Sequence, residues 1–290
     1  MRLVVISGRS GSGKSAALHV LEDQGFYCID NLPIGLLPAL ARQAEADEKL
    51  TRVAVSIDAR NLSPAGEPID QLLFELPHDQ YQLDVVYLDA SDSVLLQRFS
   101  ATRRKHPLTS ATLSLAEAIE REKSLLEPVA NMADLTLDTT HMSVHDLRSL
   151  IRLRVADKQN GDMSILFESF GFKHGIPTDA DYVFDVRHLP NPYWDERLRP
   201  MTGLDADIRH FLNGYDVVNA MKQDISSFLE RWMPKFIEAN RSYMTIAIGC
   251  TGGQHRSVFM SEELAALFRT HYPNVQVRHR ELARQSESGH

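Results

Sequence analysis

A glycine-rich segment near the start of the chain constrains the fold more than any other feature. An apolar run, from Met1 to Ser7, leads into the octad Gly-Arg-Ser-Gly-Ser-Gly-Lys-Ser at positions 8–15. Apolar residues then recur at helical spacing from Ala16 to Leu21. This order predicts a buried strand, a phosphate-binding loop and a helix, which is the context that the pattern G-x-x-x-x-G-K-S requires.

The chemistry of the octad indicates a nucleoside triphosphate as its ligand. Backbone N–H groups of such a loop wrap a phosphate, and the helix N-terminus adds partial positive charge. Lys14 would neutralise terminal phosphate oxygens, and Ser15 would ligate Mg²⁺. A flexible loop is the alternative, but the flanking patterns favour the phosphate loop. We therefore predict nucleotide contacts from Gly8, Arg9, Ser10, Gly11, Ser12, Gly13, Lys14 and Ser15.

Strand and helix patterns alternate through the rest of the N-terminal half. We expect strands at 26–29, 53–57, 83–88 and 135–138. This alternation predicts a parallel sheet covered on both faces, with ligands at the carboxyl ends of the strands. Asp30, Asp58 and Asp89 each follow a strand. Asp58 either holds Mg²⁺, as a Walker B aspartate does, or is only a turn residue.

A basic segment follows the fourth expected strand. Arg98 and the run Arg103-Arg104-Lys105 are spaced like the lid of small P-loop kinases, in which cations close over phosphates. A solvated basic face explains the same residues equally well. Ser114 and Glu117 form a capping box that predicts the start of the next helix.

The length and composition predict two α/β domains. A chain of 290 residues with 43% hydrophobic residues is long enough for two cores. The polar segment 157–162 is the best boundary, which gives domains at 1–156 and 163–290. No apolar run is long enough for a membrane span, so we expect a cytoplasmic protein with Cys28 and Cys250 as free thiols. The net charge of −8 leaves room only for local basic patches.

The C-terminal half repeats the opening arrangement. Strand patterns occur at 164–169, 182–184 and 243–248, and helical patterns at 205–212, 217–232 and 258–270. We expect Phe228, Leu229 and Trp232 to lie in the core.

The loop at 249–257 carries Cys250 and Arg256 in the spacing C-x-x-x-x-x-R, with Ser257 next. This pattern is similar to the phosphate loop of cysteine phosphatases, although Gly249 stands where those enzymes usually carry histidine. An anion-binding loop is favoured; a phosphatase and a plain turn with a buried cysteine are the alternatives.

Taken together, these motifs resemble the RapZ family, the RNase adapter proteins of bacteria, over nearly the whole chain. The segments that carry the resemblance are Gly8–Ser15, Phe26–Pro33, Asp58–Asn61, Arg103–Leu108, Phe167–Gly175, Asp179–Pro192, Pro200–Asp205 and Ile248–Val258.

The resemblance implies a kinase-like N-terminal domain that binds ATP and GTP. Its guanosine-nucleotide segment would be Asp58, Ala59, Arg60 and Asn61. It also implies a C-terminal domain that binds small regulatory RNA and senses glucosamine-6-phosphate. Such an adapter presents the RNA to RNase E, controls amino-sugar synthesis and works as a homo-oligomer, with a tetramer favoured.

The sugar phosphate is expected at the second loop, where backbone N–H groups, a helix N-terminus and an arginine coincide. A carboxylate in the loop after Phe184 would read the sugar and its amine. The expected residues are Asp185, Arg187, Tyr193, Cys250, Thr251, Gly252, Gly253, His255 and Arg256.

The tail Glu281–His290 lacks the cluster of lysines and arginines that ends RapZ proteins of enterobacterial type. RNA contacts are therefore expected from Lys173, His174, Arg256, Arg278 and Arg280. Because Arg256 would serve both ligands, RNA and sugar phosphate should compete. The alternative function is a small-molecule kinase with an appended sensing domain, in which Asp30 orients the acceptor.

Overall fold

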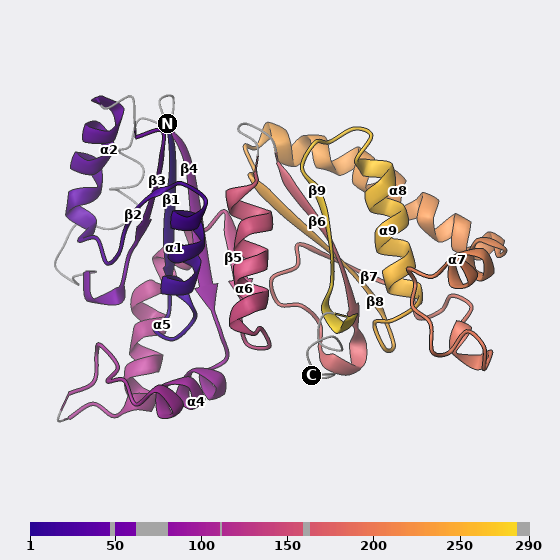
Figure 1. Ribbon diagram of the computed structural model, residues 1–290, viewed down its shortest axis with the longest axis horizontal. Coiled ribbons are helices and arrows are strands. Elements are labelled where there is room, and N and C mark those ends of the chain that lie inside the picture. The colour runs from indigo at the N-terminus through magenta and orange to yellow at the C-terminus, as the bar shows by residue number, and fades with distance from the viewer. Residues whose placement is uncertain (47–49, 62–80, 111, 159–162, 283–290) are drawn as a thin grey trace. The chain divides into compact units, whose positions relative to one another are not determined.

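The chain is described by a computed structural model that covers residues 1–46, 50–61, 81–110, 112–158 and 163–282. Two compact units, Met1–Asn160 and Gly161–His290, are described separately below. Most of the predicted linker and most of the C-terminal tail lie outside the described residues. Figure 1 shows that each unit is a sheet with helices packed on it.

The first unit contains a five-stranded sheet in which all neighbours are parallel, in the order β2-β3-β1-β4-β5 (Figure 1). The central strand β1 is apolar and buried along its length, which is the pattern of a strand covered on both faces. All carboxyl ends meet at one edge, where the 8–15 loop leaves β1. The strands are β1 (Arg2–Gly8), β2 (Tyr27–Ile29), β3 (Arg52–Ser56), β4 (Gln82–Asp89) and β5 (Leu135–Asp138).

Helices cover both faces of this sheet. Leu3 and Val5 share a buried cluster with Leu37 of α2 and Leu126 of α5. Helix α1 packs on β1 and β3, and α6 packs on α1. The helices are α1 (Lys14–Asp23), α2 (Leu37–Ala46), α4 (Asp92–Thr102), α5 (Leu115–Met132) and α6 (Val144–Ile151).

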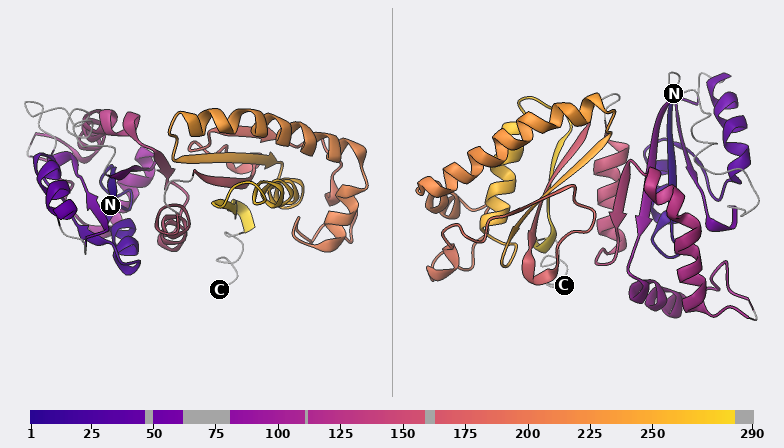
Figure 2. Two further views of the ribbon diagram at one scale, coloured as in Figure 1. Left: turned by 90° about the horizontal axis from the view of Figure 1, so that it is seen from above. Right: turned by 180° about the vertical axis from the view of Figure 1, so that it is seen from behind.

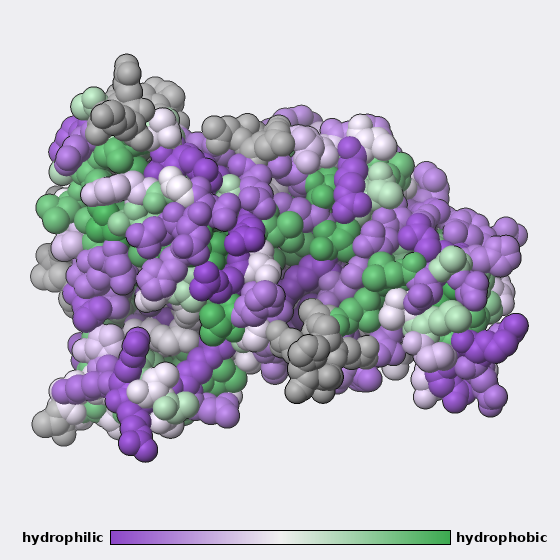
Figure 3. Space-filling model, viewed as in Figure 1, coloured by the Kyte–Doolittle hydropathy of each residue, from purple (hydrophilic) through white to green (hydrophobic). Residues whose placement is uncertain are grey.

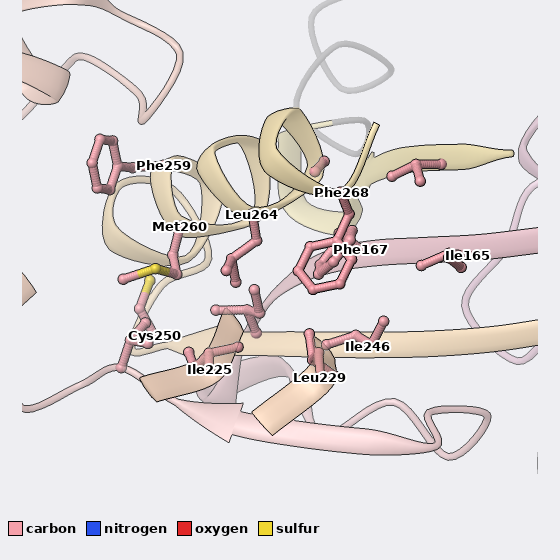
Figure 4. Packing of buried hydrophobic residues seen from close by; sticks show 14 of the residues in the cluster. Ile165, Phe167, Ile225, Leu229, Ile246, Cys250, Phe259, Met260, Leu264 and Phe268 are labelled. Atoms are coloured by element: carbon pink, nitrogen blue, oxygen red, sulfur yellow. The ribbon is translucent and has the colours of Figure 1, made fainter. Parts of the chain in front are cut away.

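The second unit contains a four-stranded parallel sheet in the order β7-β8-β6-β9. Ile165, Phe167 and Ile246 lie in one apolar cluster with residues of α8 and α9 (Figure 4). Figure 2 shows α8 from behind as a long helix beside this sheet. The elements are β6 (Ser164–Gly171), β7 (Tyr182–Asp185), α7 (Ala206–Asn213), α8 (Asp216–Glu238), β8 (Tyr243–Cys250), α9 (Arg256–Phe268) and β9 (Val275–His279).

The predicted fold class, two parallel α/β sheets with a phosphate-loop unit first, is confirmed. The capping box is also present, because the Ser114 hydroxyl accepts from the Glu117 amide at 3.4 Å and the Glu117 carboxylate accepts from the Ser114 amide at 2.9 Å. Strand β9 was not predicted, because its five residues mix polar and apolar side chains.

The prediction that Phe228 and Trp232 are core residues is wrong. Leu229 is fully buried, but Phe228 is 37% and Trp232 45% exposed. The buried stripe of α8 runs through Ile225, Leu229 and Met233, so residues one position earlier lie at its margin. Phe228 packs edge-on against Tyr182 of β7.

Candidate functional site

The backbone of the first loop requires glycine at its framing positions. Gly8 has a φ of 140°, and a Cβ there would lie 2.0 Å from the carbonyl oxygen of Leu88 in β4. Gly13 has a φ of 110°, and a Cβ there would lie 2.4 Å from Leu147 of α6. Both conformations favour glycine, because an L side chain is strained at such angles. The loop is therefore held close to the sheet on one side and to α6 on the other.

A pocket of ≈ 700 Å³ opens on this loop. It is lined by the loop itself, by the strand ends of β2 and β3, and by the segment that follows α4. This volume is ample for a nucleotide. Its polar and charged lining residues include Ser10, Ser12, Lys14, Ser15, Asp30, Asn31, Asp58, Arg60, Arg98, Arg104 and Lys105.

Lys14 carries the central positive charge of the pocket. Its Nζ donates to the carbonyl oxygens of Gly8 at 2.6 Å and Arg9 at 3.2 Å. Burial lowers the pKa of this ammonium, and the nearby carboxylates, Glu122 foremost, oppose that shift. A terminal phosphate would offer the buried ammonium a full negative charge in place of two carbonyl dipoles.

Asp58 and Arg60 form a bidentate pair beside the loop. The guanidinium donates to both carboxylate oxygens at 3.1 Å, and the Arg60 amide donates to Asp58 Oδ1 at 2.9 Å. Burial opposes the ionisation of Asp58, but these hydrogen bonds outweigh it and lower its pKa. Ser15 and Asp58 both line the pocket and offer the oxygen ligands that Mg²⁺ prefers, so these residues fit the ion.

The other residues of the segment 58–61, which was expected to bind guanosine nucleotides, connect two strand ends. Ala59–Asn61 is a 3₁₀ turn, and the Asn61 side-chain amide donates to Asn31 Oδ1 at 2.9 Å. Asp30 accepts from the Ser56 hydroxyl. The carboxyl ends of β2 and β3 are thereby joined into one polar wall of the pocket.

Two arginines that the sequence marked as possible phosphate ligands have structural roles instead. The Arg9 side chain is 3% exposed and donates to Asp89 at 2.6 Å, to Asp92 and to the Ala90 carbonyl, so only the backbone of Arg9 is available to a nucleotide. Arg98 donates to the Gly11 carbonyl at 2.9 Å and to the Thr139 carbonyl at 2.6 Å. All three of Arg98, Arg104 and Lys105 line the pocket, but only the expected lid cations Arg104 and Lys105 are exposed.

Figure 3 shows strongly hydrophilic side chains at the end of the first unit where α4 ends and this basic segment follows.

Glu122 and His106 also support the loop, a role that was predicted for neither of them. Glu122 is fully buried on α5, and its carboxylate accepts from the Ser10 amide at 2.8 Å and the Ser10 hydroxyl at 2.7 Å. The signal available was a glutamate within the apolar stripe Ala118, Leu126 and Val129 of α5. A charge at such a position requires partners.

The second loop leaves β8 and ends at α9. The buried Cys250 thiol accepts from the Gly253 amide at 3.2 Å and lies 3.2 Å from the Ser257 hydroxyl. Figure 4 places Cys250 beside Met260 in the apolar cluster. A Cβ at Gly249 would lie 2.4 Å from the Phe172 ring, so no histidine fits beside this cysteine. The phosphatase alternative therefore lacks both an accessible thiol and its supporting side chain.

Arg256 is turned inward, which corrects its expected RNA contact. The residue is 4% exposed, and Nη1 donates to the carbonyls of Arg187 at 2.5 Å and Leu189 at 3.0 Å. Nη2 lies 3.4 Å from the Thr251 hydroxyl. Arg256 thus fixes the segment after β7 against the loop. Its buried guanidinium is not exposed to contact an RNA phosphate.

His255 is also buried, and the predicted helix N-terminus is partly covered. A Cβ at Gly203 would lie 2.3 Å from the His255 carbonyl and 2.4 Å from the Phe259 amide, so this segment crosses the first turn of α9. Burial lowers the pKa of His255, and hydrogen bonds to the backbone near Arg199 and Met201 partly oppose this shift. Within the loop, Thr251 is exposed and Gly252 and Gln254 are half-buried, so these residues form its accessible part.

Three predicted residues gather around this accessible part. The Lys173 amide donates to the Thr251 carbonyl at 3.3 Å, and Lys173 Nζ lies 4.0 Å from a Cβ built on Gly252. Arg187 lies over the Phe172 ring at 3.9 Å. Asp185 accepts from Arg187 at 2.7 Å, and hydrogen bonds from Arg187 are the main cause that lowers the Asp185 pKa.

The remaining predicted residues lie elsewhere in this unit. Tyr193 is 47% exposed, and its ring contacts are with Trp194 and Arg199. His174 is exposed, as is its neighbour Lys173. The Arg278 guanidinium donates to the Glu168 carboxylate at 3.0 Å, so it already has an ionic partner within the protein. Arg280 is partly buried.

Comparison with known families gives a match to each unit. Residues 1–159 match the RapZ-like N-terminal domain, and residues 163–283 match the RapZ C-terminal domain. The chain belongs to the RapZ family. It is 55% identical over 285 residues to a nucleotide-binding protein of Marinobacter nauticus, covering 97% of both chains. It is 53% identical to a nucleotide-binding protein of Hahella chejuensis, covering 98% of this chain and 100% of that one.

Among solved structures, a shikimate kinase from Bacteroides thetaiotaomicron is similar to this RapZ-family chain with a TM-score of 0.38 and 14% identity. The match covers 52% of this chain and 94% of the kinase. In the part of the RapZ-family chain that the structure describes, no helix is both long and apolar enough to span a bilayer. The same described residues contain no cluster of three or more His, Cys, Asp or Glu side chains suited to a metal ion.

Proposed function

We propose that this nucleotide-binding protein is an RNase adapter that binds ATP or GTP with Mg²⁺ in its first unit and senses glucosamine-6-phosphate in its second. Small regulatory RNA binds the second unit, and the homo-oligomer, a tetramer in our proposal, presents it to RNase E in the cytoplasm. The observation that carries this proposal is the presence of two separate phosphate-type loops, each after a buried parallel strand, with different side chains around them.

The first loop supports the nucleotide. Lys14 meets the terminal phosphates, while Ser15 and Asp58 hold Mg²⁺, which neutralises phosphate charge when bound. Arg60 and Asn31 lie on the wall of the pocket formed by the ends of β2 and β3, where a base and ribose have hydrogen-bonding partners, and Asn61 holds the Asn31 side chain in place.

The second loop supports a smaller anion with an amine. Lys173 supplies an ammonium to the phosphate beside the Thr251 hydroxyl and the Gly252 backbone. Asp185 supplies a carboxylate for the amine of the sugar, and Arg187 keeps that carboxylate ionised. Arg256 acts indirectly, because its two hydrogen bonds hold the segment after β7 against the loop.

Lys173 also connects sugar sensing to RNA binding. It is exposed, adjacent to His174 and close to Gly252, so one ammonium serves either a sugar phosphate or an RNA phosphate. Competition therefore follows from a shared side chain, and it requires no long-range conformational change. This assignment replaces the shared role first expected of Arg256.

The sugar site is tested by Asp185→Asn. We expect the affinity for glucosamine-6-phosphate to fall about tenfold or more, because the amine loses a charged acceptor. Affinity for inorganic phosphate should change little. Calorimetry measures both, with Asp195→Asn as the control, since Asp195 pairs with Arg197 through the same two-residue spacing. Equal losses in both variants, or no loss in Asp185→Asn, would contradict the site.

The RNA surface is tested by Lys173→Ala. We expect weaker retardation of a structured RNA and a salt dependence that is shallower by about one unit of the log–log slope, because one phosphate contact is lost. Glucosamine-6-phosphate should displace RNA from the wild type. Lys235→Ala removes an exposed lysine of the same unit and serves as the control. An unchanged salt slope in Lys173→Ala, or simultaneous tight binding of both ligands, would refute the shared ammonium.

A further inference from the structure

The buried carboxylate of Glu122 connects two parts of the nucleotide pocket that are far apart in sequence. It lies on α5, is fully buried, and accepts from the amide and hydroxyl of Ser10 at 2.8 and 2.7 Å. The Nε2 atom of His106 lies 3.1 Å from the same carboxylate, and His106 is 1% exposed. A buried carboxylate is costly unless several donors surround it, and here three donors converge.

The hydrogen bonds of His106 determine which ring nitrogen carries the proton. The Leu108 amide donates to Nδ1 at 3.2 Å, so Nδ1 is the acceptor and Nε2–H donates to Glu122. The ring also packs against Phe99 of α4, with centroids 5.0 Å apart. His106 is therefore a fixed anchor that directly follows Arg104 and Lys105, the two exposed cations that line the pocket.

We propose that Glu122 is a positioning residue that fixes the phosphate loop through Ser10 and the lid cations through His106, and thereby sets the preference of the pocket for a triphosphate. This inference rests on the proposed nucleotide site. The loop amides hold the phosphates common to ATP and ADP, whereas the side chains of Arg104 and Lys105, which follow α4 and line the same pocket, meet the terminal phosphate. Losing the shared support therefore weakens ATP binding more than ADP binding.

Glutamine has nearly the same shape as Glu122 but lacks its negative charge. Three N–H or O–H donors face the carboxylate, from Ser10 and His106. A glutamine oxygen at the Oε2 position accepts from the Ser10 amide and from His106, whereas its NH₂ group at the Oε1 position requires the Ser10 hydroxyl to accept instead of donate. The contacts that remain with glutamine are neutral rather than charge-assisted, so the common anchor of loop and lid is weakened.

The test measures ATP and ADP affinities by calorimetry with Glu122→Gln in the full chain. The wild type must bind ATP, and failure there would count against the nucleotide site itself. In Glu122→Gln we expect the ratio of ATP to ADP affinity to fall about tenfold. Glu120→Gln, an exposed site on the same helix, makes the same charge change and should leave the ratio unchanged.

His106 supplies a second test if Glu122→Gln does not fold. His106→Ala removes the donor to Glu122 and should lower the ATP-to-ADP ratio, while His106→Gln restores a side-chain N–H and should recover part of it. A role in stability alone would lower the melting temperature of both variants and leave the ratio at the wild-type value. That outcome, or an unchanged ratio in a folded Glu122→Gln, overturns the proposal.

Discussion

Lys14→Ala should weaken the binding of ATP and GTP by roughly one hundred-fold, because it removes the cation that meets the terminal phosphates. The Lys14 ammonium is the only lysine charge that donates to the loop carbonyls among the described residues, through Gly8 and Arg9. Its loss cannot be replaced by Arg9, whose guanidinium is committed to Asp89 and Asp92. Titration calorimetry or fluorescent-nucleotide displacement measures the effect.

The fold should survive this substitution. Lys14 is partly buried and its pKa is lowered by burial, so removing the ammonium relieves a desolvation cost while two carbonyl hydrogen bonds are lost. Lys123→Ala, on the exposed side of α5, is the control for loss of a positive charge. Wild-type titrations of both nucleotides with Lys14→Ala would refute the assignment of the phosphate loop.

Glu168→Gln should remove a large part of the pH dependence of stability. Burial raises the pKa of Glu168 to about 7 from 4.5, and the attraction of Arg278 only partly opposes this shift. The folded state therefore holds the proton more tightly than the unfolded state, so wild-type stability falls as pH rises from about 4.5 to about 7.

Between pH 5 and pH 8 the wild type should lose stability on the order of 2–3 kcal/mol through this group, and Glu168→Gln should lose correspondingly less. Urea unfolding at the two pH values measures the difference. Glu230→Gln, an exposed carboxylate on α8, provides the control. If the free energy of unfolding changed equally with pH in the wild type and in Glu168→Gln, Glu168 would have the same pKa in the folded and unfolded states, which would contradict the prediction.

The fold was predictable from the sequence because its signals are local. The apolar run before Gly8 and the helical spacing after Lys14 specify a strand, a loop and a helix without reference to any distant residue. Ser114 with Glu117 specifies a helix start in the same way. The edge of the buried stripe of α8 was harder to predict, because the 3.6-residue period does not show whether Phe228 faces the core or lies at its edge.

The candidate sites were predictable in their backbone but not in the direction of their side chains. The sequence shows that Arg256 follows a loop, but its carbonyl partners at Arg187 and Leu189 come from the far end of another strand connection. Glu122 is likewise separated from Ser10 by 112 positions. Such partners depend on the tertiary fold, and no spacing within the sequence encodes them.

In the proposed function, one chain carries two independent phosphate-binding loops with different ligands. Calorimetric titration of glucosamine-6-phosphate into Lys14→Ala tests it most directly. Because the sugar phosphate is assigned to Lys173, Thr251 and Asp185 in the second unit, we predict wild-type affinity for the sugar phosphate in this variant, together with the loss of ATP binding. Loss of both ligands would contradict the account, and it would place the sugar phosphate beside Asp30 in the first pocket, as expected of a kinase acceptor.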